Sequence, residues 1–557
     1  MESGRYRWGA VIDAGSSGTR LRIFHWREVG RDELPQMREH RPKSEHDADL
    51  LRRRPGLSSF ATKPLLAAQQ ILALLDQARR WIPVPQHSST PLYLKATAGL
   101  RLVPPAQSKE ILDTLRIVLS NSSVCPFRFA GARVITGEEE ALFGWLSINA
   151  LLGVLQGPPE RRVGWLDLGG ASAQMAAELS TPPPHDAPDA ASVQQVHLPH
   201  ETIYLFRISH LRFGREEAFR RSCRSLLRAS ESVDRDGATV RHAHPCLTLG
   251  DEISVWMTSP TNTHARREWV FYGEGNAPRC ASLISTLLPE AVPCTAWSEG
   301  CSAMAVSPTR SFYGAGNYFY TAKQLEHSRS GVRVAGSLNV SAADYWRHAH
   351  HMCSQTWNET KAAWNESEWK HVRYGCFSGL YISELLLTSH GLPPEAKLVS
   401  VARSFDGTVV DWTLGSLLYD VALFPHRKPH SARSLRAEWH GRRYKGGRVA
   451  EPSSAATAAA LSAMLERNKR QSQIEVPSAL AKFIWNWVLP RNCNINLPLS
   501  MTPFWCLLPV GWMMLLMILA WLVGRGWMRR AGKQHQRTRH VGFHSTWNSA
   551  RTMIVPQ

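Results

Sequence analysis

Two segments about 150 residues apart share one pattern, and this repeated pattern constrains the fold of the chain more than any other feature. They read VIDAGSSGTR at 11–20 and WLDLGGASAQ at 165–174, and in each an apolar stretch ends in an aspartate, Asp13 or Asp167, before a Gly/Ser-rich turn. The N–H groups and hydroxyls of such a turn can bind an anion, and the aspartate can hold a divalent cation through water. A single turn of this kind also closes ordinary hairpins. Two turns with matching order predict a duplicated fold that holds a chain of phosphates between its halves.

The length and the charge distribution of the chain define its broad class. Its 557 residues exceed what one hydrophobic core usually supports, so we expect at least two domains. An apolar share of 43% with 20% charged residues is typical of a globular protein. The net charge of +19 comes mostly from residues after 425, and residues 525–557 alone carry seven Lys/Arg and no Asp/Glu. Because residues 1–425 are nearly neutral, we expect no nucleic-acid partner.

The C-terminal part has the pattern of a membrane anchor. Residues 504–524 are uncharged over the roughly 20 positions that a bilayer core requires. We therefore predict a transmembrane helix at 501–524, contact with the lipid bilayer, and a cytosolic tail at 525–557, since basic residues accumulate on the cytosolic side. Residues 426–500 are basic in their first part and read as an unstructured stalk. No apolar signal segment precedes the first predicted strand, so delivery to the lumen would depend on the C-terminal segment.

Cysteines and glycosylation sequons give an independent indication of the compartment. Seven of the ten cysteines lie between 223 and 376, and such clustering favours disulfides in an oxidising compartment. No CxxC pair is present, so a zinc site is not expected, and the disulfide pairing stays open. Four Asn-x-Ser/Thr sequons occur, at Asn121, Asn339, Asn358 and Asn365. Both features favour a lumenal or extracellular position for the folded part.

Strands alternate with helices along the first 425 residues, which is typical of an α/β fold. Residues 5–26 predict two strands of a hairpin, and residues 131–153 predict a strand followed by a helix that opens on three glutamates. The spacing of apolar residues predicts further helices. These lie at 64–82, 106–120, 376–391 (amphipathic, with Gly391 as its stop) and 411–424.

Two further segments carry residues suited to phosphate chemistry. KATAGLR at 95–101 is a third small-residue turn, in which Thr97, Gly99 and Arg101 can contact a phosphate. ITGEEE at 135–140 places glutamates at a strand-to-helix junction, and phosphoryl transfer to water needs a carboxylate to orient or deprotonate the attacking water. Acids also favour a helix start for electrostatic reasons alone, so the pattern does not say which glutamate faces a substrate. No GxxxxGK[ST] loop is present, so this is not a P-loop enzyme.

A series of blocks in residues 9–425 resembles the nucleoside triphosphate diphosphohydrolase (apyrase) family. In order they are DAGSSGTR, PGLSSFATKP, KATAGLRLV, ITGEEEALFGW, LDLGGASAQ, YLFRISHLRFG, YGAGNYFYTA, CFSGLYISELLL and DWTLG. The early first motif, the C-terminal apolar segment and the spacing of Cys294 and Cys301 are similar to the fungal-type Golgi apyrases. The resemblance implies two RNase H-like domains of the actin, Hsp70 and sugar-kinase superfamily, with an interdomain cleft. It places domain I at 1–136, completed by about 407–425, and domain II at 137–406.

The resemblance also implies roles for individual residues. Asp13 and Asp167 would hold the metal through water, Glu140 would be the catalytic base, and Thr97 and Gln174 would lie near the attacking water. The phosphate-binding residues would come from both turns: Ser16, Ser17, Gly18, Thr19, Gly169, Gly170, Ala171 and Ser172.

The resemblance also bears on Ala141, on the aromatic pair Tyr318 and Phe319, and on Trp412. Ala141 stands where the family usually has glycine, so a requirement for positive φ there would displace Glu140 and reduce activity. Tyr318 and Phe319 align loosely with the rings that stack on the nucleobase, and core packing is an equal explanation for them. Trp412 is expected to pack between the domains.

The activity implied by the resemblance is hydrolysis of nucleoside di- and triphosphates (GDP, UDP, ADP, ATP) to monophosphates with Ca²⁺ or Mg²⁺, and Mn²⁺ as a further option. The expected setting is a single-pass Golgi membrane protein with a lumenal catalytic part that supports protein glycosylation; endosome and plasma membrane are alternatives. The alternative functions are those of a polyphosphatase or sugar kinase of the same superfamily, or of a nucleotide-binding protein without turnover. The preferred base, the preference for di- or triphosphates and the oligomeric state stay open.

Overall fold

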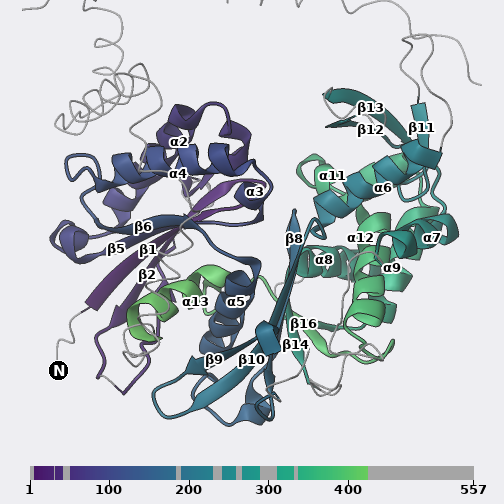
Figure 1. Cartoon of the computed structure of the whole chain (residues 1–557). Helices are drawn as coiled ribbons and strands as arrows, with labels where there is room; N and C mark the ends of the chain where they lie inside the picture. The colour runs from purple at the N-terminus through teal and green to yellow at the C-terminus, as the bar shows by residue number, and fades with distance from the viewer. Residues whose placement is uncertain are drawn as a thin grey trace, which may run out of the picture. The chain divides into compact units, whose positions relative to one another are not determined.

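The computed structural model describes most of the first 423 residues, in the ranges 6–30, 32–41, 50–183, 190–229, 241–258, 266–288, 310–330 and 336–423. The predicted stalk, transmembrane helix and tail lie outside these ranges, as do Cys294 and Cys301. No helix within the described ranges is long and apolar enough to cross a membrane. The fold is α/β with two large mixed sheets (Figure 1).

The first sheet is built around the first of the two matching segments. Its strands run in the order β3-β2-β1-β5-β6, with β4 beside β2. β1 and β2 form the predicted hairpin, and β5 and β6 add to it in parallel. The bounds are β1 Tyr6–Ala14, β2 Thr19–Arg27, β3 Arg38–Glu39, β4 Arg52–Arg53, β5 Pro91–Ala96 and β6 Arg128–Val134.

The second sheet repeats this plan around the second segment. Its order is β15-β16-β14-β7-β8-β10-β9, with an antiparallel β7–β8 hairpin and β14 parallel to β7. In each hairpin the aspartate pairs with the residue seven positions later, Asp13 with Arg20 and Asp167 with Gln174. The two hairpins therefore share one register, as the predicted duplication requires. The bounds are β7 Gly164–Leu168, β8 Ser172–Leu179, β9 Val193–His197, β10 Thr202–Leu211, β14 Phe312–Gly316, β15 Leu338–Val340 and β16 Val399–Val401.

Helices cover both faces of each sheet and give each its own core. We call the first sheet with α2, α3 and α4 the first lobe, and the second sheet with α6 to α9 and α12 the second lobe. α5 packs on β7, β8 and β10, while α13 contacts both α5 and β1, so this helix pair lies between the sheets (Figure 1). The bounds are α2 Pro64–Trp81, α3 Ala98–Arg101, α4 Pro105–Ser120, α5 Gly137–Leu151, α6 Arg215–Ala229, α7 Ala277–Leu287, α8 Asn317–Ser330, α9 Ala342–Ser354, α12 Gly375–Glu384 and α13 Trp412–Leu418.

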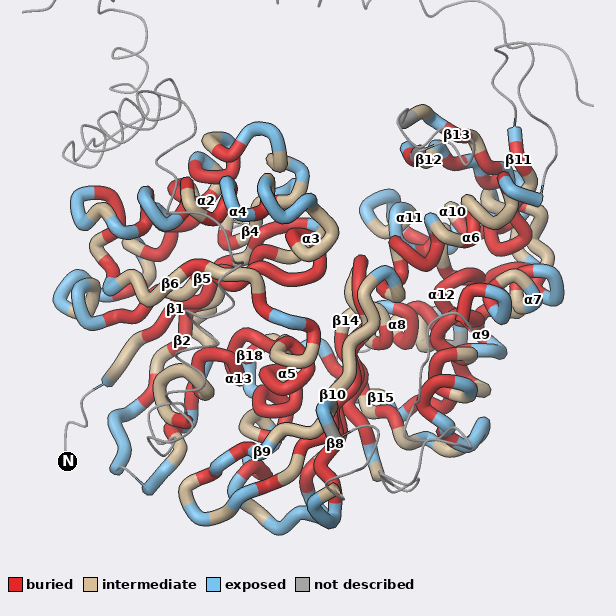
Figure 2. Tube along the Cα trace, in the orientation of Figure 1, coloured by how far each residue is buried: buried red, intermediate tan, exposed pale blue. Residues whose placement is uncertain are grey.

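The helix expected at 376–391 has the predicted extent but a different environment. α12 continues as a π-helical turn to Ser389, and Gly391 follows with a φ of 61°, as expected for the glycine that ends a helix. Nearly every residue from 375 to 386 is buried (Figure 2), because α7, α8 and α9 pack around the helix. The prediction of an amphipathic helix is therefore wrong here: this helix is buried on all sides.

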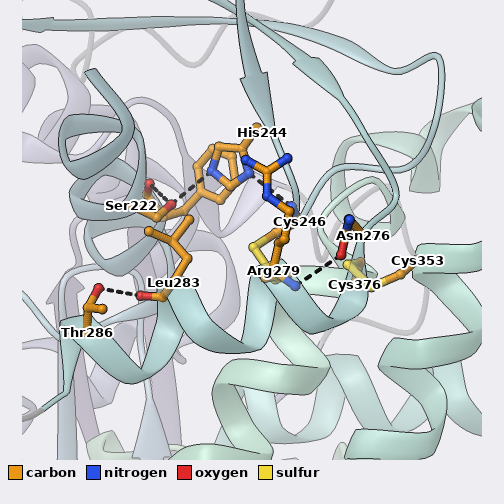
Figure 3. The surroundings of a disulfide bond; sticks show 11 residues. Ser222, His244, Cys246, Asn276, Arg279, Leu283, Thr286, Cys353 and Cys376 are labelled. Carbon is orange, nitrogen blue, oxygen red and sulfur yellow. Dashed lines mark hydrogen bonds between the residues drawn. A yellow bond between two sulfur atoms is a disulfide. The ribbon is translucent and has the colours of Figure 1, made fainter. Parts of the chain in front are cut away.

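Among the described residues, the second lobe also contains a small three-stranded sheet and two disulfides. Its order is β11-β13-β12, with β11 Arg241–His244, β12 Glu252–Thr258 and β13 Arg266–Gly273. The disulfides join Cys246 to Cys280 and Cys353 to Cys376 (Figure 3). Clustered cysteines therefore do form disulfides, as the sequence predicted, whereas Cys125 and Cys223 are free and buried. Further short elements are α10 Trp357–Ala363, α11 Glu366–Val372, β17 Ser404–Phe405 and β18 Thr408–Val409.

Candidate active site

The two Gly/Ser turns lie in contact, one from each lobe. A Cβ built on Gly170 would lie 2.9 Å from Ser16 Oγ, so the second turn reaches the first. A Cβ built on Gly99 would lie 2.8 Å from Ser16 Cα, which brings the third small-residue turn to the same place. The three segments that the sequence selected as phosphate-binding thus meet at one point of the fold.

Each turn is held by backbone contacts that leave little room for side chains. The carbonyls of Gly169, Gly170 and Ala171 accept hydrogen bonds from the amides of Arg215, Glu217 and Arg212 at 2.7 to 3.1 Å. The carbonyl oxygens, which would repel a phosphate, are thereby engaged away from it. In the first turn, a Cβ on Gly18 would lie 2.8 Å from the carbonyl oxygen of Arg53, so the end of β4 covers this turn. Ser17 is exposed, and Thr19 is fully buried in β2.

Asp13 and Asp167 lie at the ends of β1 and β7, and burial determines their charge. Asp13 is 5% exposed, and its Oδ2 accepts a hydrogen bond from Arg20 Nη1 at 3.1 Å. Burial raises the pKa of Asp13, and Arg20 partly opposes this effect. Burial, together with the nearby carboxylates of Asp411 and Asp13, raises the pKa of Asp167 to about 7, and Arg20 partly opposes this rise. The acids are therefore close enough to repel one another.

Asp411 joins this group although sequence reasoning did not select it. It is the N-cap of α13, where its Oδ1 accepts from the amide of Thr413 at 2.9 Å, while Oδ2 pairs with Arg22. Asp411 is the first residue of the DWTLG block, in which the sequence prediction concerned only Trp412. Trp412 itself is 4% exposed in the core formed by α5, α13 and the inner faces of both sheets, which confirms its predicted packing role.

The three glutamates at the start of α5 have different environments. Glu139 forms a capping box with Thr136 and accepts hydrogen bonds from both terminal guanidinium nitrogens of Arg133. Glu138 borders a surface pocket of about 320 Å³. Glu140 is 6% exposed and accepts hydrogen bonds from Arg101 and, at 3.4 Å, from Gln174 Nε2. The helix-start explanation thus holds for Glu139, and Glu140 is the glutamate buried beside the two aspartates.

The pKa of Glu140 depends on its burial and on the charged side chains around it. Burial and, to a smaller extent, the carboxylates of Asp167 and Asp13 raise its pKa to about 8, against the opposing effect of Arg101. An acid whose pKa lies near neutrality beside polar groups is a recurring property of catalytic carboxylates.

Gln174 and Thr97 occupy the space next to Glu140 and the first turn. Gln174 is 3% exposed, and its Nε2 donates to Ser172 Oγ at 2.6 Å and to Ser209 Oγ at 3.1 Å. Thr97 is 5% exposed, and its amide donates to the carbonyl of Ala14. Ser209, from β10, was missed by the sequence reasoning, because it lies in a strand without any turn or acid to mark it.

Ala141 is accommodated in an ordinary helix. It is fully buried in the second turn of α5. Among the non-glycine residues with described backbone, only Arg212 and Asp406 have positive φ. The position therefore has no need for glycine, and the expectation that alanine displaces the base is not supported.

The two aromatic residues expected at the nucleobase differ from that expectation. Tyr318 is 1% exposed, with its hydroxyl 3.4 Å from His390 Nε2, so its ring belongs to the core of the second lobe. Phe319 is half-buried against the same core. The next residue, Tyr320, is 56% exposed, and its ring stacks with that of His371 at a centroid distance of 6.3 Å. A buried ring cannot stack on a base, so Tyr318 is a packing residue.

Asp13 and Asp167 are the carboxylates next to the two turns that could hold a cation, directly or through water. The described part of the chain has no group of three or more His, Cys, Asp or Glu side chains placed to hold a metal ion. Asp13 Oδ1 is buried without a hydrogen-bond partner in the same part of the chain. Carboxylates that repel one another and an orphaned carboxylate oxygen are what a nearby hydrated cation would stabilise.

Comparison with known proteins identifies the family of the chain. Residues 1–433 match the model of the GDA1/CD39 (nucleoside phosphatase) family. The chain therefore belongs to this family and is an enzyme of the nucleoside phosphatase class.

Individual relatives align with this chain over most of their own length. The nucleoside-diphosphatase mig-23 of Caenorhabditis elegans is 27% identical over 463 residues, 77% of this chain and 79% of that protein. The human ectonucleoside triphosphate diphosphohydrolase 2 is 29% identical over 447 residues, 76% of this chain and 84% of that protein. A crystal structure of nucleoside triphosphate hydrolases from Neospora caninum aligns with a TM-score of 0.49 and 17% identity, over 76% of this chain and 93% of that one.

Proposed function

We propose that this protein removes the terminal phosphate of nucleoside di- and triphosphates in a reaction that depends on a divalent cation. The observation that carries the proposal is the position of Glu140. This buried carboxylate lies beside Gln174, at the point where two Gly/Ser turns meet with the buried Asp13 of one lobe and the partly buried Asp167 of the other.

Substrate binding would use both turns. Ser16, Ser17, Gly18 and Thr19 of the first lobe and Gly169, Gly170, Ala171 and Ser172 of the second would hold the phosphate oxygens, in the manner of anion-binding backbone nests. Asp13 and Asp167 would hold Ca²⁺ or Mg²⁺ through water, and the cation would neutralise phosphate charge as the bond to the leaving group breaks. Tyr320, rather than Tyr318, is the exposed ring available to a nucleobase at this edge of the second lobe.

Water activation would depend on the contacts of Glu140. Its raised pKa makes it a stronger base than an exposed glutamate. Gln174 donates to Glu140, Ser172 and Ser209 through one nitrogen, so its amide would orient the attacking water between the base and the second turn. Thr97, at the end of β5, would contact the same water or the terminal phosphate.

The setting of the reaction is proposed from the sequence. A membrane helix at 501–524 would anchor the catalytic part in the Golgi lumen, where it would supply nucleoside monophosphates during glycosylation. Asn339, Asn358 and Asn365 are exposed, so their sequons are accessible to glycosylation there. The division into domain I (1–136 with about 407–425) and domain II (137–406) also stays a proposal.

One assay tests the activity and the base together. Phosphate release from GDP, UDP, ADP and ATP is measured with Ca²⁺, Mg²⁺ or chelator, for the full chain and for Glu140→Gln. We expect cation-dependent release that falls about 10²- to 10⁴-fold in the variant, the usual contribution of a general base. Undiminished hydrolysis in the variant would refute the assignment of the base. Nucleotide binding without any release by the wild type would refute hydrolysis itself.

Tail accessibility tests the topology. In sealed vesicles with the lumen inside, protease added outside should remove residues 525–557 and leave the catalytic part intact. Protection of the tail would contradict the proposed orientation.

A further inference from the structure

The segment 52–56 lies against the first Gly/Ser turn and carries arginines that have no role in the reaction proposed above. Arg52 of β4 pairs with Arg20 of β2 in the first sheet. A Cβ built on Gly56 would lie 2.5 Å from the carbonyl oxygen of Ser16, so this segment packs on the backbone of the turn. Its side chains are therefore next to the place where the turn would hold a phosphate.

Arg52 is a cation without an acidic partner in the described part of the chain. Its neighbours in the sheet are paired. Arg20 forms an ion pair with Asp13 at 3.1 Å, and Arg22 forms one with Glu39 at 2.8 Å. The side chain of Arg52 makes no hydrogen bond or ion pair with another described residue, and its Nε is buried without a partner. Because a buried donor without an acceptor costs free energy, a bound acceptor at Arg52 would stabilise the site.

Like charges also surround the Arg52 guanidinium. Burial and three nearby arginines together lower the pKa of Arg52 to about 10, and these arginines are Arg20, Arg54 and Arg22. The guanidinium still carries its charge at pH 7. An anion beside it would relieve the repulsion between these cations.

Arg52 also lies near the exposed aromatic pair of the second lobe. The phenol group of Tyr320 in α8 partly opposes the lowering of the pKa of Arg52. Burial lowers the pKa of His371 to about 4, and Arg54 is among the cations that contribute to this shift. The rings of His371 and Tyr320 stack on one another. Arg52 is therefore close to the first turn, through Arg20, and also to the ring that we propose for the nucleobase.

A nucleoside diphosphate would connect the same two places. Its terminal phosphate would lie at the turns beside Glu140, and its base at Tyr320. The phosphate bonded to the nucleoside then lies between them, on the side of Arg52. A guanidinium suits this position, because it can donate two parallel hydrogen bonds to a phosphate.

We propose that Arg52 binds the nucleoside-proximal phosphate of a nucleoside diphosphate and stabilises this phosphate as the leaving group. The inference rests on the proposed function and adds a binding residue for the second phosphate. In the reaction the water oxygen bonds to the terminal phosphorus, and the proton of the water passes to Glu140. The bond from this phosphorus to the bridging oxygen breaks, and its electron pair stays on the bridging oxygen. The proximal phosphate thus gains one negative charge beside Arg52, and a contact that strengthens in the transition state raises kcat.

Binding of a nucleoside monophosphate tests the site without turnover. Calorimetry with AMP, UMP and GMP on the full chain identifies the monophosphate that the wild type binds most tightly, which is then measured with the variants. We expect Arg52→Gln to raise its Kd about 10- to 100-fold, the range for a hydrogen bond between charged groups. Arg52→Lys should lie between wild type and Arg52→Gln, because lysine keeps the charge and loses the paired donors. A Kd within twofold of wild type in Arg52→Gln would overturn the inference.

Kinetics test the role in the leaving group. With the corresponding diphosphate as substrate, Arg52→Gln should lower kcat at least tenfold. A rise in KM with unchanged kcat would show that Arg52 binds the substrate without stabilising the transition state, and would overturn this half of the proposal. Arg80→Gln is the matched control, because Arg80 is exposed in the last turn of α2 and its loss changes the net charge equally. Its Kd and kcat should stay within twofold of wild type.

Thermal stability separates binding from a structural role. The fold disfavours the charged form of Arg52, as the direction of its pKa shift shows. Without ligand, Arg52→Gln should therefore melt at the same or a higher temperature than wild type. A lower melting temperature together with the loss of kcat would show that Arg52 supports the fold instead.

The proposed function and this inference fail in different ways. If Glu140→Gln keeps full hydrolysis, the proposed function fails whatever Arg52 does. If Glu140→Gln is inactive while Arg52→Gln binds the monophosphate as wild type does, only the present inference fails. A wild type that binds no nucleotide would overturn both.

Discussion

Replacing Ala141 by glycine, the usual residue of the family at this position, should weaken the protein without improving catalysis. Ala141 is fully buried inside α5, directly after Glu140. Glycine in a helix interior costs about 0.5–1 kcal/mol relative to alanine, and the lost buried methyl costs about 0.8 kcal/mol more. The free energy of unfolding should therefore fall by about 1.5 kcal/mol.

The expected shift in melting temperature follows from this value. Unfolding entropy near 60 °C is about 2.1 cal/mol/K per residue, so for a folded part of roughly 400 residues a loss of 1.5 kcal/mol lowers Tm by about 2 °C. The assay is differential scanning fluorimetry of the full chain, with kcat/KM measured on the same preparation. We expect kcat/KM within twofold of wild type.

The opposite outcome has a clear meaning. If Ala141→Gly raised kcat/KM tenfold or more, alanine would displace Glu140 in the native protein, and the helical position of residue 141 would not describe the active state. Ala150, a partly buried alanine later in α5, offers a matched control: Ala150→Gly should lower Tm by a similar amount and leave kcat/KM unchanged.

Three other predictions concern the turns, the cation and pH. Gly170→Ala should raise KM about tenfold, because the added Cβ would meet Glu216 and lie 2.9 Å from Ser16 Oγ; Gly336→Ala, where a Cβ meets nothing within 4 Å, should leave KM unchanged. Cation binding at pH 7 should release protons, because pKa values of about 8 for Glu140 and about 7 for Asp167 leave both partly protonated until a cation favours their ionised forms. Calorimetry in buffers of different ionisation enthalpy measures this proton release. The release should vanish above about pH 9, where both groups are already ionised. Burial lowers the pKa of His244 to about 3, below its usual 6.5. Between pH 6.5 and about pH 3 the unfolded chain therefore binds a proton that the folded chain does not. In this range His244 should lower the free energy of unfolding by about 1.4 kcal/mol for each unit of pH decrease. Urea unfolding between pH 4 and 8 should show a flatter profile in His244→Phe; an unchanged profile would contradict the assignment.

Much of the local structure could be predicted because its signals are local. The hairpin of β1 and β2, helices α2 and α4 and the strand–helix pair around residue 136 follow from apolar spacing, turn residues and caps within each segment. The helix predicted at 376–391 forms, but its predicted amphipathic character is wrong, because its polar residues, such as Ser378 and Ser383, are small enough to be buried among neighbouring helices.

The sequence by itself determined the chemistry of the site: two aspartates after apolar strands, two Gly/Ser turns, and a glutamate at a helix start. These are properties of short segments, and their order along the chain was enough to indicate the family. Only the tertiary structure decided which glutamate is buried beside the aspartates, that Ala141 is harmless, that Tyr318 is a core residue and that Asp411 and Ser209 join the site. Each of these depends on burial and on contacts between residues far apart in the chain, and such contacts set pKa values, free space and hydrogen-bond partners that no local pattern encodes.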